Sequence, residues 1–245
     1  MRSPRHLSLS QSGGVVHEFW RAHNREYLLR TPESRSLYLS CVTKALEHKS
    51  VKGEVFVSAY CVMSNHVHMV THYTKLSESL SNFMRVGHTR FGQVFNKIHK
   101  RQGPVAYDRP KTPLVQEQIW NLMRVHFYVE ANPLRAGMVK DLKLYKHSSF
   151  RFYAWGIRDE YSKYLQEPEW YKALGTTAKA RQSRYRSLFD KYLRELAMKR
   201  LSFFTRGRYI GDPLWVSSRE ATYGALLKSN RSLKNPGSDP PIVVV

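Results

Sequence analysis

The sequence predicts an α+β protein with a ferredoxin-like antiparallel sheet and helices on one face of it. Segments with the two-residue period of strands alternate with segments of helical period, in the order strand, helix, strand pair, helix, strand, helix. An antiparallel sheet packed against helices accommodates this order. Beyond about residue 155 the chain is rich in helix formers and basic residues, so we expect a mainly helical, basic C-terminal annex.

The first strand and the first helix are expected near the N-terminus. Residues 14–20 (GVVHEFW) are mostly β-branched and aromatic, which favours a strand. Pro32 opens a helix over residues 33–49, because proline suits a first helical turn and apolar residues follow at helical spacing. This helix should pack on the sheet.

A β-hairpin is expected next. Residues 54–63 alternate in character, and the side chains that should share one face are Val55, Val57, Ala59, Cys61 and Met63. After Ser64 and Asn65, residues 66–73 continue as the second strand, and the short connection implies that the two strands pair directly.

Three further elements complete the predicted core. Residues 76–98 read as a helix interrupted by two glycines, and its basic, aromatic second half suits contact with a phosphate chain. Residues 104–113 can form a short strand, at a sheet edge that tolerates their three prolines. Residues 115–131 form a helix that ends at Asn132-Pro133, because a residue before proline is disfavoured in the helical region.

We therefore divide the chain into a core domain over residues 1–155 and an annex over residues 156–245. The annex should bind DNA through its basic residues, and its Pro-, Gly- and Ser-rich tail from about residue 230 should be loosely held. The residues proposed below for chemistry fall wholly within the core domain.

Charge restricts the class of partner. The chain has 40 Lys and Arg against 19 Asp and Glu, a formal net charge of +21, and 13% of its residues are aromatic. This combination favours nucleic acid as the partner over a membrane surface. No apolar segment is long enough for a signal peptide or a membrane span, and both cysteines lie in apolar runs, so we expect a cytoplasmic protein.

His66 and His68 form the first candidate constellation. Residues i and i+2 of a strand point to the same face, so both imidazoles can converge on one metal ion while Val67 faces the core. A pair of ordinary strand histidines is the more common explanation of this spacing when it stands alone.

Tyr128 and Asn132 form the second constellation. Positions i and i+4 lie on one helix face, with Arg124 one turn earlier. A half-buried tyrosine near a helix end is the ordinary alternative. Taken with His66 and His68, however, the amide completes an open, uncharged set of three ligands for a divalent ion, to which a DNA phosphate can add. Tyr128 can then attack that phosphate and form a phosphotyrosine ester without ATP.

These residues resemble those of the one-tyrosine HUH transposases, particularly the REP-associated tyrosine transposases. Residues 60–70 (YCVMSNHVHMV) resemble that family's strand, turn and histidine strand, and residues 128–139 (YVEANPLRAGMV) resemble its nucleophile helix and NPxRAG turn. Two shorter segments add to the likeness: His17, Arg21 and Asn24 resemble an HxxxRGN segment, and residues 148–151 resemble a Ser-Ser-Tyr/Phe-Arg segment.

The resemblance implies metal-dependent cleavage and transfer of single-stranded or hairpin DNA. It implies that Tyr128 forms a 5′-phosphotyrosyl link and that His66, His68 and Asn132 bind Mg²⁺ or Mn²⁺. The enzyme would act as a monomer or homodimer. DNA contacts are expected from polar and basic residues spread along the core domain, namely Arg21, Asn24, Arg85, Arg90, Arg124 and Arg135.

Two other functions are compatible with the sequence. A domesticated DNA-hairpin-binding protein would recognise the same DNA without cutting it. A metal hydrolase would use the paired histidines to activate water and would release a free 5′-phosphate instead of a covalent adduct, although no acidic residue accompanies the histidines as a general base.

Overall fold

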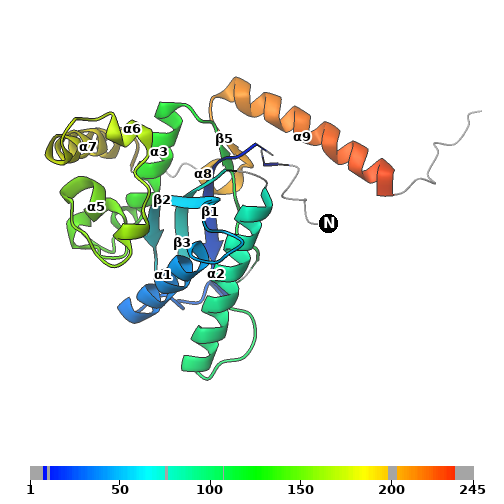
Figure 1. The fold of residues 1–245 in the computed structure, drawn as a ribbon, viewed down its shortest axis with the longest axis horizontal. Helices are drawn as coiled ribbons and strands as arrows, with labels where there is room; N and C mark the ends of the chain where they lie inside the picture. The colour runs from blue at the N-terminus through cyan, green and yellow to red at the C-terminus, as the bar shows by residue number, and fades with distance from the viewer. Residues whose placement is uncertain (1–7, 10–11, 75–76, 107, 198–202, 235–245) are drawn as a thin grey trace, which may run out of the picture.

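The computed structural model describes residues 8–9, 12–74, 77–106, 108–197 and 203–234. Its centre is a five-stranded sheet with the order β2-β3-β1-β4-β5 (Figure 1). In the described part of the chain, no helix is long and apolar enough to cross a membrane, and both Cys41 and Cys61 are buried free thiols.

Three long antiparallel strands form most of the sheet. β1 (Gly14–Arg21) pairs along its full length with β3 (His66–Tyr73), and β3 pairs with β2 (Val55–Val62) to form the predicted hairpin. The order of these strands agrees with the predicted α+β, ferredoxin-like class. Because β3 pairs with β1 on one side and with β2 on the other, its histidines are held on a strand that is hydrogen-bonded along both edges.

Two short strands extend the sheet beyond β1. β4 (Leu114–Val115) pairs antiparallel with β1, and β5 (Tyr209–Ile210) pairs parallel with β4, so the sheet is mixed. The strand expected within residues 104–113 therefore begins just after that range. Among the residues of that range that the structure describes, Ala106 and Lys111 make isolated bridges, to Ala22 and Phe19 respectively.

Helices cover both faces of the sheet, which differs from the predicted single face. α1 (Pro32–Leu46) and α2 (Ser77–Ile98) pack on one face, in a core that includes Trp20 and Met69. α3 (Ile119–Glu130) packs on the other face, against Val70 and its neighbours. The strands are apolar on both sides, so each side requires its own cover.

A β-bulge in β2 corrects the predicted strand face. The register shifts between Val57 and Ala59, so Val55 and Val57 face the α1/α2 core, whereas Ala59, Cys61 and Met63 face α3. The carbonyl of the extra residue, Ser58, accepts hydrogen bonds from His126 Nε2 (3.0 Å) and the Tyr153 hydroxyl (2.6 Å). The bulge therefore leaves no buried carbonyl unpaired at this point.

α3 ends at Glu130, one residue before the predicted end at Ala131, and a short helix, α4 (Asn132–Arg135), follows directly. Asn132 is itself helical although it precedes Pro133, so the expected loss of helical conformation at Asn132 is not seen. α3 begins at Ile119 instead of residue 115, because Leu114 and Val115 belong to β4.

The C-terminal region is mainly helical, as predicted, and it is joined to the core sheet by β5. Its α-helices are α6 (Glu169–Lys172), α7 (Ala178–Tyr192), α8 (Phe203–Arg206) and α9 (Pro213–Lys234), and α5 (Phe150–Trp155) precedes them at the end of the core domain. Shorter helical turns are η2 (His23–Arg25) and η3 (Leu142–Leu144) in the core domain, and η4 (Ser162–Tyr164) and the π-helical η5 (Leu193–Ala197) in the C-terminal region.

These helices occupy different positions around the core. α7 packs on α3 and α5 in the second core, whereas α9 extends away from the body in Figure 1. The tail expected from residue 230 begins as the last turn of α9, and its residues from 235 lie outside the described part of the chain.

Candidate active site

The four residues proposed for chemistry line one pocket of about 330 Å³. β1 and β3 form its floor, and the end of α3, α4 and α8 form its walls. The residues that line it are Phe19, Arg21, Met63, His66, His68, Tyr128, Asn132, Arg135, Ala136 and Thr205. The structure therefore brings together the paired histidines and the tyrosine helix, which are about sixty residues apart in the sequence.

His66 and His68 project from the same face of β3, as the strand period requires. Their ring centroids are 5.0 Å apart, and Val67 between them is buried in the opposite, α1/α2 core. His66 is half-buried and His68 is buried, with Phe19 against both rings. The floor of the pocket is therefore a rigid pair of imidazoles.

Hydrogen bonds decide which nitrogen of His66 carries the proton. Its Nδ1 lies 2.7 Å from Asn65 Oδ1, and the amide nitrogen of Asn65 is turned toward Arg25 O at 3.4 Å. Because an amide oxygen only accepts, His66 Nδ1 must donate. The Nε2 atom of His66 then keeps its lone pair.

Burial keeps both histidines neutral near pH 7. Loss of hydration lowers the pKa of His66 to about 4, and the Arg21 charge acts in the same direction. The pKa of His68 lies well below its usual value, first because of burial and then because of the nearby His66. Two neutral imidazoles can donate lone pairs to a metal ion without first losing protons.

Asn132 is held rigidly at the start of α4, just after α3. Its Nδ2 donates to the carbonyls of Tyr128 (2.9 Å) and Val129 (3.0 Å), so the amide oxygen, Oδ1, is turned away from the backbone of α3. Arg135 donates to that Oδ1 at 2.9 Å and to the Tyr128 carbonyl at 2.8 Å. The amide oxygen and the guanidinium thus share one wall of the pocket.

Aromatic and cationic groups enclose the Tyr128 ring. Phe204 stacks on it at a centroid distance of 4.2 Å, and Arg135 Cζ lies 4.0 Å from the ring centroid. His17 and His68 meet the ring edge-on at 5.6 and 5.7 Å. Tyr128 is buried, so its ring position is fixed by packing.

The donor set fits a divalent metal ion. Two neutral imidazole nitrogens and one amide oxygen line the same pocket, and the positive Arg21 and Arg135 beside them suit an anionic phosphate. In the described part of the chain there is no cluster of three or more His, Cys, Asp or Glu that could hold a metal. Because neutral imidazoles and an amide carry no charge, a charged ligand from the substrate would be needed for tight binding of a metal ion.

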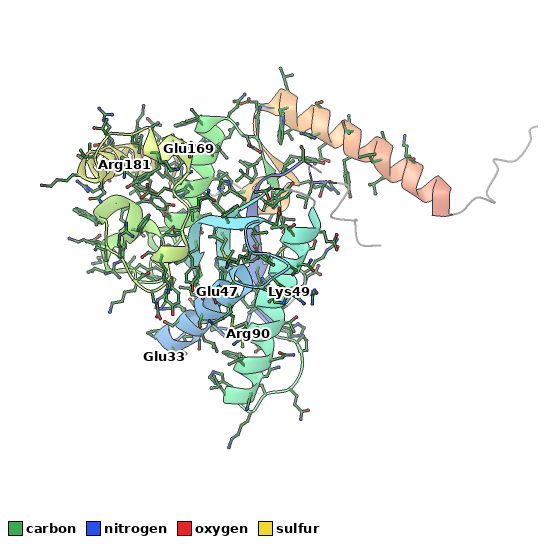
Figure 2. The ribbon with its side chains drawn as sticks, viewed as in Figure 1. Glu33, Glu47, Lys49, Arg90, Glu169 and Arg181 are labelled. Atoms are coloured by element: carbon green, nitrogen blue, oxygen red, sulfur yellow. The ribbon has the colours of Figure 1, made fainter. Side chains whose placement is uncertain are left out.

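The residues predicted to contact DNA are not all near the pocket. Arg21 and Arg135 line it, and Asn24 is exposed in the turn that follows β1. Arg124 lies over the Trp120 ring, outside the pocket lining. Arg85 and Arg90 are exposed on α2, on the opposite side of the sheet; Arg90 is labelled in Figure 2.

Three residues at or beside the pocket were not predicted from the sequence. His17, on β1, is fully buried and contacts the carbonyl of Phe204 in the C-terminal region. In α8, Phe204 packs on Tyr128 and Thr205 lines the pocket. The four residues proposed for chemistry all precede residue 156, but the C-terminal region thus also contributes to the surroundings of the site. His17 matched the HxxxRGN-like segment, which was a usable signal, whereas nothing in the sequence around Phe204 indicated its position.

Fold and site together define an α+β protein in which a strand with paired histidines faces a helix with a tyrosine and an asparagine. A solved structure entitled "Structure of the REP associates tyrosine transposase bound to a REP hairpin" is similar to this chain, with a TM-score of 0.53 and 17% sequence identity. The similarity covers 65% of this chain and 89% of the other. It shows a shared fold, in agreement with the sequence resemblance. No protein-family model and no curated protein matches the chain.

Proposed function

We propose that this protein is an HUH-type tyrosine transposase, which cleaves single-stranded or hairpin DNA and transfers the strand through a 5′-phosphotyrosine intermediate. The observation that carries the proposal is the convergence of His66, His68, Tyr128 and Asn132 on one pocket. The shared fold with a hairpin-bound tyrosine transposase supports the same substrate class.

In this proposal His66, His68 and Asn132 hold a divalent ion, Mg²⁺ or Mn²⁺. When bound, the ion supplies a positive charge that polarises the scissile phosphate and stabilises its transition state. Arg21 and Arg135 place two further positive charges beside the same phosphate. These cations offset the negative charge that develops during phosphoryl transfer.

Tyr128 is the proposed nucleophile. Its phenolic oxygen gives up its proton and forms a bond to phosphorus, the bond from phosphorus to the 3′ oxygen breaks, and that oxygen takes up a proton and leaves as a 3′-hydroxyl. One phosphodiester is exchanged for another, so a free 3′-hydroxyl can reverse the step or complete the transfer to a new strand. Because the pocket is formed by one chain, Tyr128 can act together with the histidines of its own subunit.

A covalent-adduct assay tests this function. The full-length protein is incubated with a labelled hairpin oligonucleotide that carries a single-stranded flank and with Mn²⁺, and the products are resolved on a denaturing gel. We expect a labelled protein band with the wild type and none with Tyr128→Phe, which removes only the hydroxyl. Tyr27→Phe is the matched control, because Tyr27 is 66% exposed and does not line the pocket.

The two competing functions give different results in the same assay. Tight, salt-sensitive hairpin binding with no adduct would favour the non-cleaving DNA-binding protein. A free 5′-phosphate without a protein adduct would favour the metal hydrolase. Persistent adduct in Tyr128→Phe would place the nucleophile elsewhere. Tyr145 is a poor substitute because its hydroxyl is buried and donates to Val62 O at 2.6 Å, and Tyr107 lies outside the described residues.

A further inference from the structure

We propose that His17 is a positioning residue that fixes the tautomer of His68, and that it does so through a hydrogen-bond relay that begins at the backbone carbonyl of Phe204. The inference rests on the proposed function, because His68 is a proposed metal ligand. The tautomer itself, however, is a property of the protein without metal or DNA and can be measured separately.

The relay consists of two hydrogen bonds in a buried environment. His17 Nδ1 lies 2.8 Å from the carbonyl oxygen of Phe204, and His17 Nε2 lies 2.9 Å from His68 Nδ1. The planes of the two imidazoles lie within 11° of each other with centroids 5.0 Å apart, which suits an edge-to-edge hydrogen bond, and both rings are buried. His17 thus links the C-terminal region to the histidine strand.

The Phe204 carbonyl determines which atom donates and which accepts in both hydrogen bonds of the relay. A carbonyl oxygen can only accept, so His17 Nδ1 carries the proton and donates. In a neutral imidazole the other nitrogen, Nε2, is then an acceptor, and the group that faces it, His68 Nδ1, must be a donor. His68 is left with an unprotonated Nε2.

The alternative tautomer of His68 leaves buried groups without partners. If its proton moved to Nε2, two nitrogen lone pairs would face each other between His68 and His17. If His17 also changed tautomer to donate to His68, its Nδ1 lone pair would face the Phe204 carbonyl oxygen, and this buried contact of 2.8 Å would become repulsive. Burying a polar group without a partner is costly, so one tautomer is strongly favoured.

The relay prepares His68 to bind a metal ion. The hydrogen bond from His66 Nδ1 to Asn65 Oδ1 fixes the same tautomer in His66, so both histidines have an unprotonated Nε2. A metal ion then meets two free lone pairs and no proton has to be displaced. The C-terminal region acts on the site in this way although it supplies none of the proposed ligands.

NMR of the full-length, metal-free protein tests the proposal directly. In the protein labelled with ¹⁵N-histidine, long-range proton–nitrogen correlations identify the protonated nitrogen of each ring. We expect His68 to be protonated at Nδ1 and His17 at Nδ1. Observation of His68 protonated at Nε2 in the wild type would overturn the proposal, and this result does not depend on any variant being folded.

Two substitutions of His17 form a matched pair. His17→Gln keeps both functions, because its amide nitrogen can donate to the Phe204 carbonyl and its oxygen can accept from His68. His17→Phe keeps a planar ring but provides neither. We expect His68 to remain in one tautomer in the glutamine variant and to populate both tautomers in the phenylalanine variant. An unchanged His68 spectrum in His17→Phe would refute the relay.

Binding of Mn²⁺ in the presence of an oligonucleotide gives a second readout. We expect His17→Phe to weaken Mn²⁺ binding about tenfold or more, the usual effect of losing such an orienting partner, and His17→Gln to stay near the wild type. If His17→Gln removed Mn²⁺ binding as completely as His66→Ala, His17 would itself be a ligand and the positioning role would be wrong. If the tautomers were as expected but no adduct formed in any variant, the proposed function would fail while the relay would stand.

Discussion

The packing of Phe204 on Tyr128 can be tested by one substitution, Phe204→Ala. The Phe204 side chain is completely buried, and its ring stacks on Tyr128 with an interplanar angle of 27°. Because β5 follows only a few residues later, this contact helps to hold the C-terminal region on α3.

The expected size of the effect follows from burial. Replacing a fully buried phenylalanine by alanine typically lowers the free energy of unfolding by about 3 to 5 kcal/mol, because apolar contacts are lost and a cavity remains. The aromatic pair with Tyr128 adds about 0.5 to 1.5 kcal/mol beyond burial. We therefore expect a loss of about 3 kcal/mol or more, together with a weaker adduct band because the tyrosine ring gains freedom.

Urea unfolding of the full-length protein measures this loss. Leu214→Ala is the control: Leu214 is 86% exposed at the start of α9, so we expect a change within about 0.5 kcal/mol. A loss below about 1 kcal/mol in Phe204→Ala, with an unchanged adduct yield, would refute the argument that α8 is packed against the site.

Three further predictions concern metal, phosphate and acid. His66→Ala and His68→Ala should abolish adduct formation in Mn²⁺ while the protein stays folded. Asn132→Ala should have a milder effect, because water can replace one neutral oxygen ligand. An equal loss of adduct in all three variants on the denaturing gel would contradict this ranking. The affinity for single-stranded DNA should fall as the salt concentration rises. If Arg135 neutralises one phosphate, Arg135→Gln should reduce the slope of log K against log salt concentration by about 0.7. An unchanged slope, measured by fluorescence anisotropy, would show that Arg135 does not contact a phosphate. Burial lowers the pKa of His72 to about 4. As the pH falls below 6.5, a proton therefore binds His72 in the unfolded chain before it binds His72 in the folded protein. The free energy of unfolding should fall by up to about 3 kcal/mol between pH 6.5 and pH 4. Urea unfolding at each pH should show a shallower fall for His72→Gln.

Much of the fold could be predicted because its signals are local. The strand over residues 66–73 and the helix opening at Pro32 were predicted at their observed starts, since period and proline placement act over a few residues. The face of β2 was predicted only in part. A bulge depends on which groups can pair with the displaced carbonyl, and here they come from His126 and Tyr153, far along the chain.

In the site, too, some features follow from local spacing in the sequence and others depend on distant parts of the chain. The sequence alone determined which side chains could do the chemistry: the strand period places His66 and His68 on one face, and the helix period places Tyr128 beside Asn132. Those spacings are set by the backbone itself and hold wherever a strand or a helix forms.

Only the tertiary structure decided that these two pairs meet in one pocket and what surrounds them. It brought β5 and Phe204 back to the sheet, more than fifty residues after the last predicted site residue, and so gave His17 a carbonyl to pair with. No periodicity in the sequence encodes such a contact. It arises because the buried faces of the sheet and the unpaired edge of β4 must be covered by whichever part of the chain fits them.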